Sequence, residues 1–137
     1  MNLIVCIDKD NGLMFNGRRQ SQDRVVREKI LSLCDGAKVW MNAYSAKQFE
    51  DVTKITIAED FLLQAKVGAY VFVEDGQLPE PSSIERVFIF HWNRKYPADV
   101  YFTLDLKTEG FRKKQTMEFV GSSHDRITMD VYERKTT

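Results

Sequence analysis

The stretch EFVGSSHDRITMDVYERK, residues 118–135, decides the class of fold because the hydrophobic pattern of the chain changes there. Ile127, Met129 and Val131 alternate with polar residues, and a period of two is typical of a half-buried β-strand. The residues from Gly121 to Asp125 have the composition of a turn, so two strands are expected around them. The alternation further predicts an exposed antiparallel edge of a sheet.

The chain before this stretch alternates short apolar runs with helical patterns. Val26, Ile30 and Leu33 have the spacing of a helix that begins at Asp23, whereas residues 8–22 read as a polar loop. Apolar runs predict buried strands, and capping residues predict two shorter helices. The expected strands cover residues 3–7, 38–41, 53–57, 69–73 and 86–92, and the shorter helices cover residues 42–49 and 59–66.

This order of elements predicts an α/β fold with a mixed, mostly parallel sheet flanked by helices and closed by the antiparallel C-terminal hairpin. We expect one domain over residues 1–137, because this length is typical of a single domain and no linker or repeat interrupts it. In such sheets, ligands bind beyond the carboxyl ends of the strands.

The composition limits the classes of partner that we expect this chain to bind. Twenty basic and twenty acidic residues cancel, which argues against nucleic acid and anionic membranes. The longest apolar runs have about five residues, against roughly 20 for a membrane-spanning helix, and no signal peptide is visible. Cys6 and Cys34 lack metal-ligand spacing and read as reduced core residues, so we expect a cytoplasmic protein without a metal site.

Two ends of the chain carry a family resemblance. MNLIVCIDKDNGL, residues 1–13, resembles the first strand and mobile loop of dihydrofolate reductases. ADVYF at 98–102, Gly-Phe at 110–111 and the stretch at 118–135 are similar to the closing strands of the same family. KVWMNAYSAKQF, at 38–49, stands where the family has a strand, Met-Gly-Arg/Lys-x-Thr and a helix. The resemblance implies a dihydrofolate-reductase-like domain.

Asp23 is the catalytic candidate that the resemblance implies. Family members carry an acid at the start of the first helix, where it holds the pterin ring and helps to deliver a proton while NADPH delivers hydride. That chemistry needs a carboxyl group with a raised pKa. Asp23 also suits a structural helix cap, and the nearby arginines would lower its pKa. Both interpretations remain open at this point.

The resemblance implies three cofactor-binding positions, and all depart from the family pattern. Asn42 replaces the family's glycine, and Ser45 stands in for its threonine. Gly76 belongs to Val-Glu-Asp-Gly at 73–76, which aligns with the family's Ile-Gly-Gly beside the cofactor pyrophosphate. Two carboxylates there would repel phosphates, and Pro79 and Pro81 break the helix that should follow. NADPH binding is therefore disfavoured, and capping is the simpler role for Asn42 and Ser45.

The substrate positions depart as well. The family's loop tryptophan and the arginine for the folate tail have no counterparts. Arg18, Arg19 and Arg24 would instead form a phosphate or carboxylate clamp, unless they are a solvated loop balanced by acids. Trp92, at the carboxyl end of the strand expected at 86–92, would stack a planar ligand or simply pack the strand end.

The leading hypothesis is a divergent, non-reductase member, a pseudoenzyme, that binds a small anionic or heteroaromatic ligand in the family cleft. One alternative is an active NADPH-dependent dihydrofolate reductase or a related oxidoreductase, since fold alone does not fix function. Another is an interaction or oligomerisation protein, such as a homodimer, that uses the arginine loop.

Overall fold

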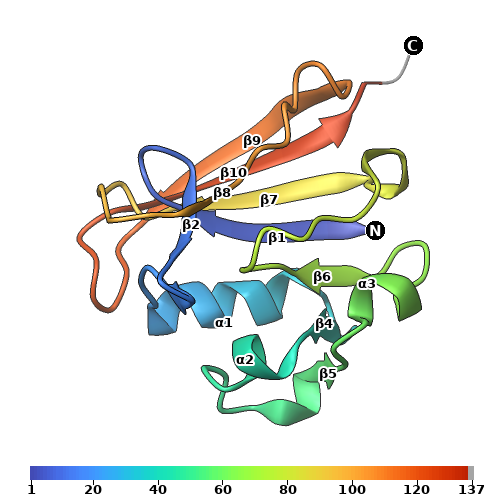
Figure 1. The fold of residues 1–137 in the computed structure, drawn as a ribbon, viewed down its shortest axis with the longest axis horizontal. Coiled ribbons are helices and arrows are strands. Elements are labelled where there is room, and N and C mark those ends of the chain that lie inside the picture. Colours follow the sequence, from blue (N-terminus) through green and yellow to red (C-terminus); the bar gives the residue numbers. More distant parts are fainter. Residues whose placement is uncertain (136–137) are drawn as a thin grey trace.

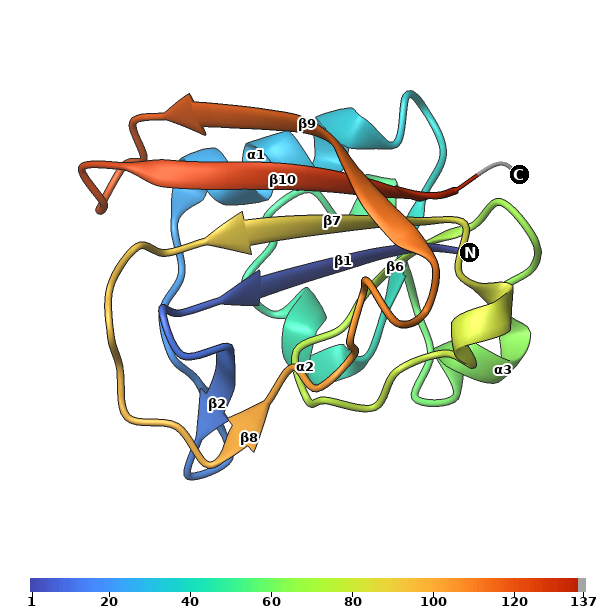
Figure 2. The same ribbon diagram turned by 90° about the horizontal axis from the view of Figure 1, so that it is seen from above.

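The computed structural model of the protein describes residues 1–135, which form a seven-stranded mixed sheet (Figures 1 and 2). The central strand β1 pairs in parallel with β6 and β7, and β10 pairs antiparallel with both β7 and β9. The strand order is β5 (Ile55–Ile57), β4 (Val39–Met41), β6 (Tyr70–Phe72), β1 (Asn2–Ile7), β7 (Arg86–His91), β10 (Ile127–Arg134) and β9 (Phe111–Phe119). The expected α/β architecture with an antiparallel C-terminal pair is therefore confirmed.

A second, three-stranded sheet lies beside the first, where a polar loop was expected at residues 8–22. Its strands are β2 (Gly12–Phe15), β3 (Arg18–Arg19) and β8 (Val100–Tyr101), with β2 in the middle. Asn16 and Gly17 connect β2 to β3 with positive φ angles of 52° and 74°, as a tight hairpin requires. Leu13 and Met14 are buried by this arrangement, which explains why the segment is not a free loop.

The helices are α1 (Arg24–Leu33), α2 (Ala43–Ala46) and α3 (Phe61–Gln64), together with two 3₁₀ turns, η1 (Val52–Lys54) and η2 (Pro81–Ser83). Helix α1 agrees with the expected spacing, because Val26 and Ile30 are its fully buried residues. The two shorter helices end earlier than expected. Beyond α3, the chain turns extended at Ala65, with φ −65° and ψ 135°.

Each face of the large sheet carries its own apolar core, and α1 and α3 lie on opposite faces (Figure 2). On the α1 face, Ile30 packs with residues such as Ile4 and Phe90. On the α3 face, Phe61 packs with residues such as Val5. Each such side chain stabilises the fold by roughly 1.5–3 kcal/mol on burial.

Strand β10 is not the edge strand that its alternation predicted. Ile127, Met129 and Val131 are buried in the core on the α1 side, and β9 shields β10 as the true edge. The preceding strand begins at Phe111, earlier than expected, and the residues between Phe111 and Phe119 are exposed. The period of two therefore reports that one face of β10 is buried, and it does not place the strand at an edge.

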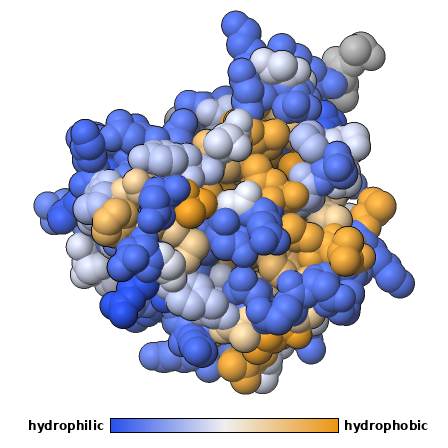
Figure 3. Space-filling view, in the orientation of Figure 1, coloured by the Kyte–Doolittle hydropathy of each residue, from blue (hydrophilic) through white to orange (hydrophobic). Residues whose placement is uncertain are grey.

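Apolar side chains also reach the surface on the side of the molecule seen in Figure 1. Figure 3 shows apolar surface in the middle of this view and towards α3, and Leu63 and Val67 are 87% and 89% exposed. Within residues 1–135, no helix combines the length and apolar composition needed to cross a membrane.

Candidate functional site

The carboxyl ends of the parallel strands place several polar side chains at one edge of the large sheet. Asp8 follows β1, Asn42 follows β4, Glu74 lies two residues after the end of β6, and Trp92 follows β7. The turn between β9 and β10 reaches the same edge, because its backbone contacts Asp23 at the start of α1. This edge is where α/β sheets bind ligands.

Asp23 begins α1 as its N-cap residue. Its backbone is extended, with φ −153° and ψ 129°, and its Oδ1 accepts hydrogen bonds from the backbone N–H groups of Val25 at 2.9 Å and Val26 at 3.3 Å. These donors have no partner within the helix, so a carboxylate here stabilises the first turn. The capping interpretation of Asp23 thus has a direct geometric basis.

The same carboxylate holds the turn between β9 and β10. The backbone N–H groups of Ser122 and Ser123 donate to it at 3.0 and 2.8 Å, and the Ser123 hydroxyl donates at 3.2 Å. Gly121 permits this approach, because a Cβ there would overlap the carboxylate and lie 2.9 Å from its Cγ. A serine-rich turn about 100 residues away in sequence therefore closes over the start of α1.

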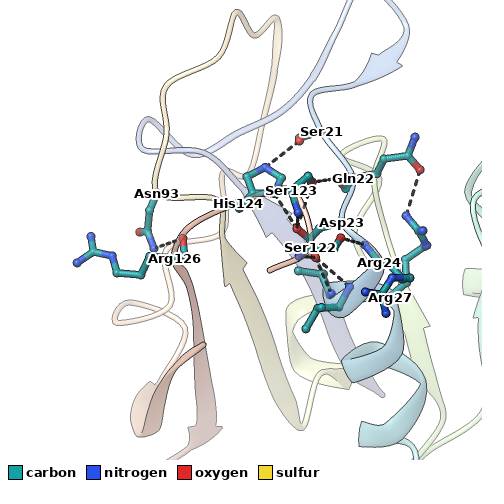
Figure 4. A network of polar contacts seen from close by, with 12 residues as sticks. Ser21, Gln22, Asp23, Arg24, Arg27, Asn93, Ser122, Ser123, His124 and Arg126 are labelled. Carbon is teal, nitrogen blue, oxygen red and sulfur yellow. Dashed lines mark hydrogen bonds and ion pairs between the residues drawn. The ribbon is translucent and has the colours of Figure 1, made fainter. Parts of the chain in front are cut away.

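His124 completes the partners of Asp23 (Figure 4). Its Nδ1 lies 2.9 Å from Asp23 Oδ2, and its Nε2 lies 3.0 Å from the Ser21 hydroxyl and 3.3 Å from the Tyr96 hydroxyl. The Trp92 ring stacks on the imidazole with centroids 4.7 Å apart and planes at 24°. Trp92 is only 4% exposed, so packing against His124 is the contact that this structure gives it.

These contacts fix the charge of Asp23. Burial of its side chain, which is fully enclosed, opposes ionisation, but the hydrogen bonds from Ser123, His124, Ser122 and Val26 outweigh it and hold the pKa far below its usual range. A carboxylate with such a low pKa is a hydrogen-bond acceptor and an orienting group. It is poorly suited to donate a proton near neutral pH.

Arg19 turns inward from β3 and pairs with Glu74. The Arg19 Nε lies 2.9 Å from Glu74 Oε2 and its Nη2 lies 3.2 Å from Oε1, so the contact is bidentate. The guanidinium also stacks over the Tyr44 ring at 4.3 Å and donates to the Tyr44 carbonyl at 3.1 Å. Both charged side chains are largely buried, with 17% and 10% exposed.

The side chains of Ser45 and Gln48 each donate a hydrogen bond to the same Glu74 carboxylate, at 2.7 and 3.2 Å. Asn42 caps α2 by accepting from the backbone N–H of Ser45 at 2.9 Å. Gly76 lies in the turn beyond β6 with φ 83°, where a Cβ would lie 2.8 Å from Val100. Of the three residues expected at a cofactor site, Ser45 thus donates to a carboxylate of the chain itself, and Asn42 caps a helix.

The three arginines of the expected clamp lie in different surroundings. Arg24 is exposed and pairs with Glu28 one turn along α1, at 2.9 Å. Arg18 is exposed at the mouth of a pocket of about 270 Å³, which also involves Arg19. The pocket is lined by Phe15, Asn16, Arg18, Arg19, Gln20, Tyr96 and Pro97. Of the expected clamp, only Arg18 and Arg19 share a pocket.

Gln20 anchors the inner side of this pocket. Its amide nitrogen donates to Asp8 at 2.9 Å and to the Pro97 carbonyl at 3.2 Å, which fixes the orientation of the amide. Its Oε1 is the one buried side-chain oxygen or nitrogen in the described part of the chain without a hydrogen-bond partner. Because an unpaired buried acceptor costs about 1–3 kcal/mol, this atom favours a ligand that carries a donor.

One other side chain bears on the chemistry of this edge. Cys6 lies in β1, where burial of its thiol group together with the negative charge of Glu74 raises the pKa of the thiol, so the thiol stays protonated. Among the residues with described positions, no group of three or more His, Cys, Asp or Glu side chains is arranged to hold a metal ion.

A larger pocket of about 690 Å³ lies elsewhere, between β7, β10 and residues 102–107, and it includes His91. The His91 Nε2 lies 3.0 Å from Asp130, whose other oxygen accepts from Thr116. This pair links neighbouring strands on the face opposite to α1, because Ile89 and Tyr132, two positions away along the same strands, belong to the core on the α3 side. A second hollow, of about 630 Å³, lies between α3 and residues 75–83.

The comparisons with known proteins agree with the fold described above. A search of solved structures matches a dihydrofolate reductase from Enterococcus faecalis complexed with NADP(H) and RAB-propyl. The TM-score is 0.69, the identity is 9%, and the match covers 98% of this chain and 96% of that chain. No family model matches the sequence, and no curated protein matches it either. The chain therefore has a dihydrofolate-reductase-like fold with a strongly divergent sequence.

The sequence pattern did not indicate His124 as a member of this candidate site, because residues 121–125 have the composition of a turn. The two atoms that join His124 to Asp23 belong to residues 101 positions apart, and no local pattern reports such a contact. The only sequence signal was indirect: a turn with Gly121 and two serines exposes many backbone donors, and such donors suit a nearby carboxylate.

Proposed function

We propose that this chain is a divergent dihydrofolate-reductase-like protein that lacks ordinary reductase activity and binds a small anionic or heteroaromatic ligand at the mouth of the family cleft. The observation that carries the proposal is the state of Asp23, which accepts hydrogen bonds from Val25, Val26, Ser122, Ser123 and His124. A reductase of this type needs that carboxyl group as a proton source beside its substrate, and an ionised, fully engaged carboxylate does not serve this purpose.

The contacts of Glu74 support the loss of the cofactor site. The resemblance to dihydrofolate reductases implies that residues 73–76 would lie beside the cofactor pyrophosphate. In this chain, the Glu74 carboxylate accepts hydrogen bonds from Arg19, Ser45 and Gln48. A dinucleotide would have to displace a bidentate ion pair and then meet an uncompensated, largely buried carboxylate. Such a charge costs several kcal/mol, so these residues do not suit a pyrophosphate.

The pocket beside Arg18 supports the class of ligand. Its volume of about 270 Å³ lies just below the usual range for drug-sized ligands, roughly 300–1,000 Å³, which favours a small molecule. Arg18 offers an exposed guanidinium for a carboxylate or phosphate. Phe15, 47% exposed, and Tyr96 offer aromatic surfaces for a planar ring, and Gln20 Oε1 offers an acceptor for a ring N–H.

Calorimetric titration with pterin-6-carboxylate and with adenosine monophosphate tests this proposal. We expect saturable binding of at least one of these probes, weakened roughly 10- to 100-fold by Arg18→Gln, since a hydrogen bond to a charged group contributes about 1.5–3 kcal/mol. Arg24→Gln is the matched control, because Arg24 lies outside this pocket and should bind as the unmodified protein does. An equal loss in both variants would contradict the assignment of the pocket.

The loss of reductase activity has its own test. NADPH-dependent reduction of dihydrofolate, followed by absorbance, should be indistinguishable from the reaction without protein. Saturable turnover that Asp23→Asn abolishes would overturn the proposal, because it would show that Asp23 delivers a proton despite its hydrogen bonds.

A further inference from the structure

Three side chains at the start of α1 and in the turn between β9 and β10 stand in a line. The Ser21 hydroxyl lies 3.0 Å from His124 Nε2, and His124 Nδ1 lies 2.9 Å from Asp23 Oδ2 (Figure 4). We propose that these residues form a nucleophilic site, in which Ser21 attacks small carboxylic esters, His124 is the general base and Asp23 orients the imidazole. A serine, a histidine and a carboxylate in this order are recognised by geometry and not by sequence position.

The orientation of His124 suits a general base. With Asp23 accepting the proton on Nδ1, the neutral imidazole directs the lone pair of Nε2 towards Ser21. The stacked Trp92 ring holds the plane of the imidazole. The Tyr96 hydroxyl is the second group near Nε2, but at 3.3 Å it is farther than the Ser21 hydroxyl. The imidazole is therefore held by Asp23 at Nδ1, and the Ser21 hydroxyl is the nearer of the two hydroxyls at Nε2.

Burial differs among the three residues in the way that such chemistry needs. The side chains of Asp23 and His124 are 0% and 3% exposed, so water does not compete for their hydrogen bond. Ser21 is partly exposed, so a substrate can reach its hydroxyl. A buried acid and base behind an accessible nucleophile make a pre-organised arrangement.

A donor for the developing oxyanion lies next to the nucleophile in the chain. Among the described residues, the backbone N–H of Gln22 donates to no other backbone or side-chain group. In hydrolases with a serine nucleophile, the N–H of the following residue is one of the groups that stabilise the tetrahedral oxyanion. The Gln22 N–H is free to take this role.

The proposed reaction balances with water as the second reactant. The Ser21 oxygen forms a bond to the ester carbonyl carbon while its proton moves to His124 Nε2. The bond from this carbon to the alcohol oxygen then breaks, and the leaving alcohol takes the proton from His124. Water, deprotonated by His124, next attacks the acyl-serine, and the carboxylic acid leaves as the proton returns to Ser21.

The size and place of the substrate follow from the neighbouring residues. Gln20, which precedes the nucleophile, and Tyr96, which contacts the base, both line the pocket of about 270 Å³. A pocket of this size next to Ser21 favours an ester with a short acyl group. The substrate would share the pocket that Arg18 lines, but the nucleophilic chemistry depends only on the geometry of Ser21, His124 and Asp23.

A fluorophosphonate probe tests the proposal, because it forms a covalent bond with activated serines. We expect the intact protein to be labelled at Ser21, mapped by peptide mass spectrometry, at least ~100-fold faster than at Ser32 or Ser83 of the same molecules, the lower end of a general-base contribution. This comparison needs no variant and so cannot be confused with misfolding. Labelling of Ser21 no faster than that of Ser32 would overturn the proposal.

Variants then identify the base. Ser21→Ala should abolish the labelling, while Ser32→Ala, an exposed control on α1, should leave it unchanged. His124→Gln should slow the labelling of Ser21 by a factor of about 100 or more, provided that thermal unfolding shows a folded protein. p-Nitrophenyl acetate should give a burst of nitrophenolate that Ser21→Ala removes. A burst that persists in Ser21→Ala would place the reaction elsewhere, whatever the ligand titrations at Arg18 show.

Discussion

The Asp23 carboxylate joins two segments that lie about 100 residues apart in the sequence. It accepts the first N–H groups of α1 on one side and those of Ser122 and Ser123 on the other. A single side chain thus caps a helix and anchors a hairpin turn. The same hydrogen bonds keep the carboxylate ionised, cap the helix and hold the turn in place.

Replacing Asp23 by asparagine should destabilise the protein strongly. The amide keeps one acceptor oxygen but turns an NH₂ group towards Ser123 and His124, which are themselves donors. We expect the free energy of unfolding to fall by about 2–4 kcal/mol, measured by urea denaturation. Asp10→Asn, at an exposed residue that faces Lys95 at 3.6 Å, should change it by less than about 1 kcal/mol. Equal effects would contradict the role of Asp23.

The low pKa of Asp23 predicts a loss of stability in acid. A carboxyl group whose folded pKa lies below its unfolded value of about 3.9 stabilises the native state above that pH. This contribution is lost as the pH falls below about 4 towards the folded pKa. The free energy of unfolding of the unmodified protein should therefore fall more steeply between about pH 5 and about pH 2 than that of Asp23→Asn. Parallel curves would show that Asp23 does not titrate with unfolding.

Other lowered pKa values do not disturb this comparison. Burial opposes the ionisation of Asp8 and Asp130, but hydrogen bonds outweigh it, from Gly12 and Tyr96 to Asp8 and from Thr116 to Asp130. Both carboxylates are present in the unmodified protein and in Asp23→Asn. Their acid dependence is common to both curves, so the difference between the curves isolates Asp23.

Among the elements, those with a strong local pattern were predictable from the sequence. The apolar runs predicted the parallel strands of the large sheet, and the spacing of Val26 and Ile30 predicted α1. The resemblance of residues 1–13 and 118–135 to dihydrofolate reductases gave the topology, which the structural comparison supports. These features depend on periodicity and on chain order, which a sequence carries directly.

Features that depend on distant partners were not predictable. The small sheet needs β8, whose residue Val100 pairs with Met14 far back in the chain, so residues 8–22 read as a loop. The interior position of β10 in the sheet depends on β9, which pairs with it from Phe111 to Phe119. Likewise, Glu74 read as a repulsive acid, because its partner Arg19 is 55 residues away. In each case a tertiary contact decides what the local pattern leaves open.

Arg19 of β3 and Glu74, just after β6, should be energetically coupled. Arg19 and Glu74 are largely buried and bidentate, so removing either one leaves an uncompensated charge. A double-mutant cycle with Arg19→Met and Glu74→Gln should give a coupling of about 1–3 kcal/mol in urea denaturation. The exposed pair of Arg24 and Glu28 is the control and should give less than about 0.5 kcal/mol. Coupling energies of the same size in both cycles would contradict the buried character of the first pair.

At the scale of the whole molecule, the sheet keeps the dihydrofolate-reductase-like topology. The polar groups at the carboxyl ends of its parallel strands form hydrogen bonds with other groups of the same chain. Asp23 is engaged by the turn between β9 and β10, and Ser45 and Arg19 are engaged by Glu74. The large sheet positions these groups by burying a core on each face. This arrangement supports the proposal that the fold persists while the chain no longer binds the ligands of dihydrofolate reductases.

The most direct test of this account is a calorimetric titration of NADPH into the pure protein. We expect no saturable heat up to high micromolar ligand, because Arg19, Ser45 and Gln48 already donate their hydrogen bonds to Glu74. Saturable binding in the low micromolar range would contradict it, since a dinucleotide would then have displaced the contacts of Glu74 or found phosphate donors elsewhere in the cleft.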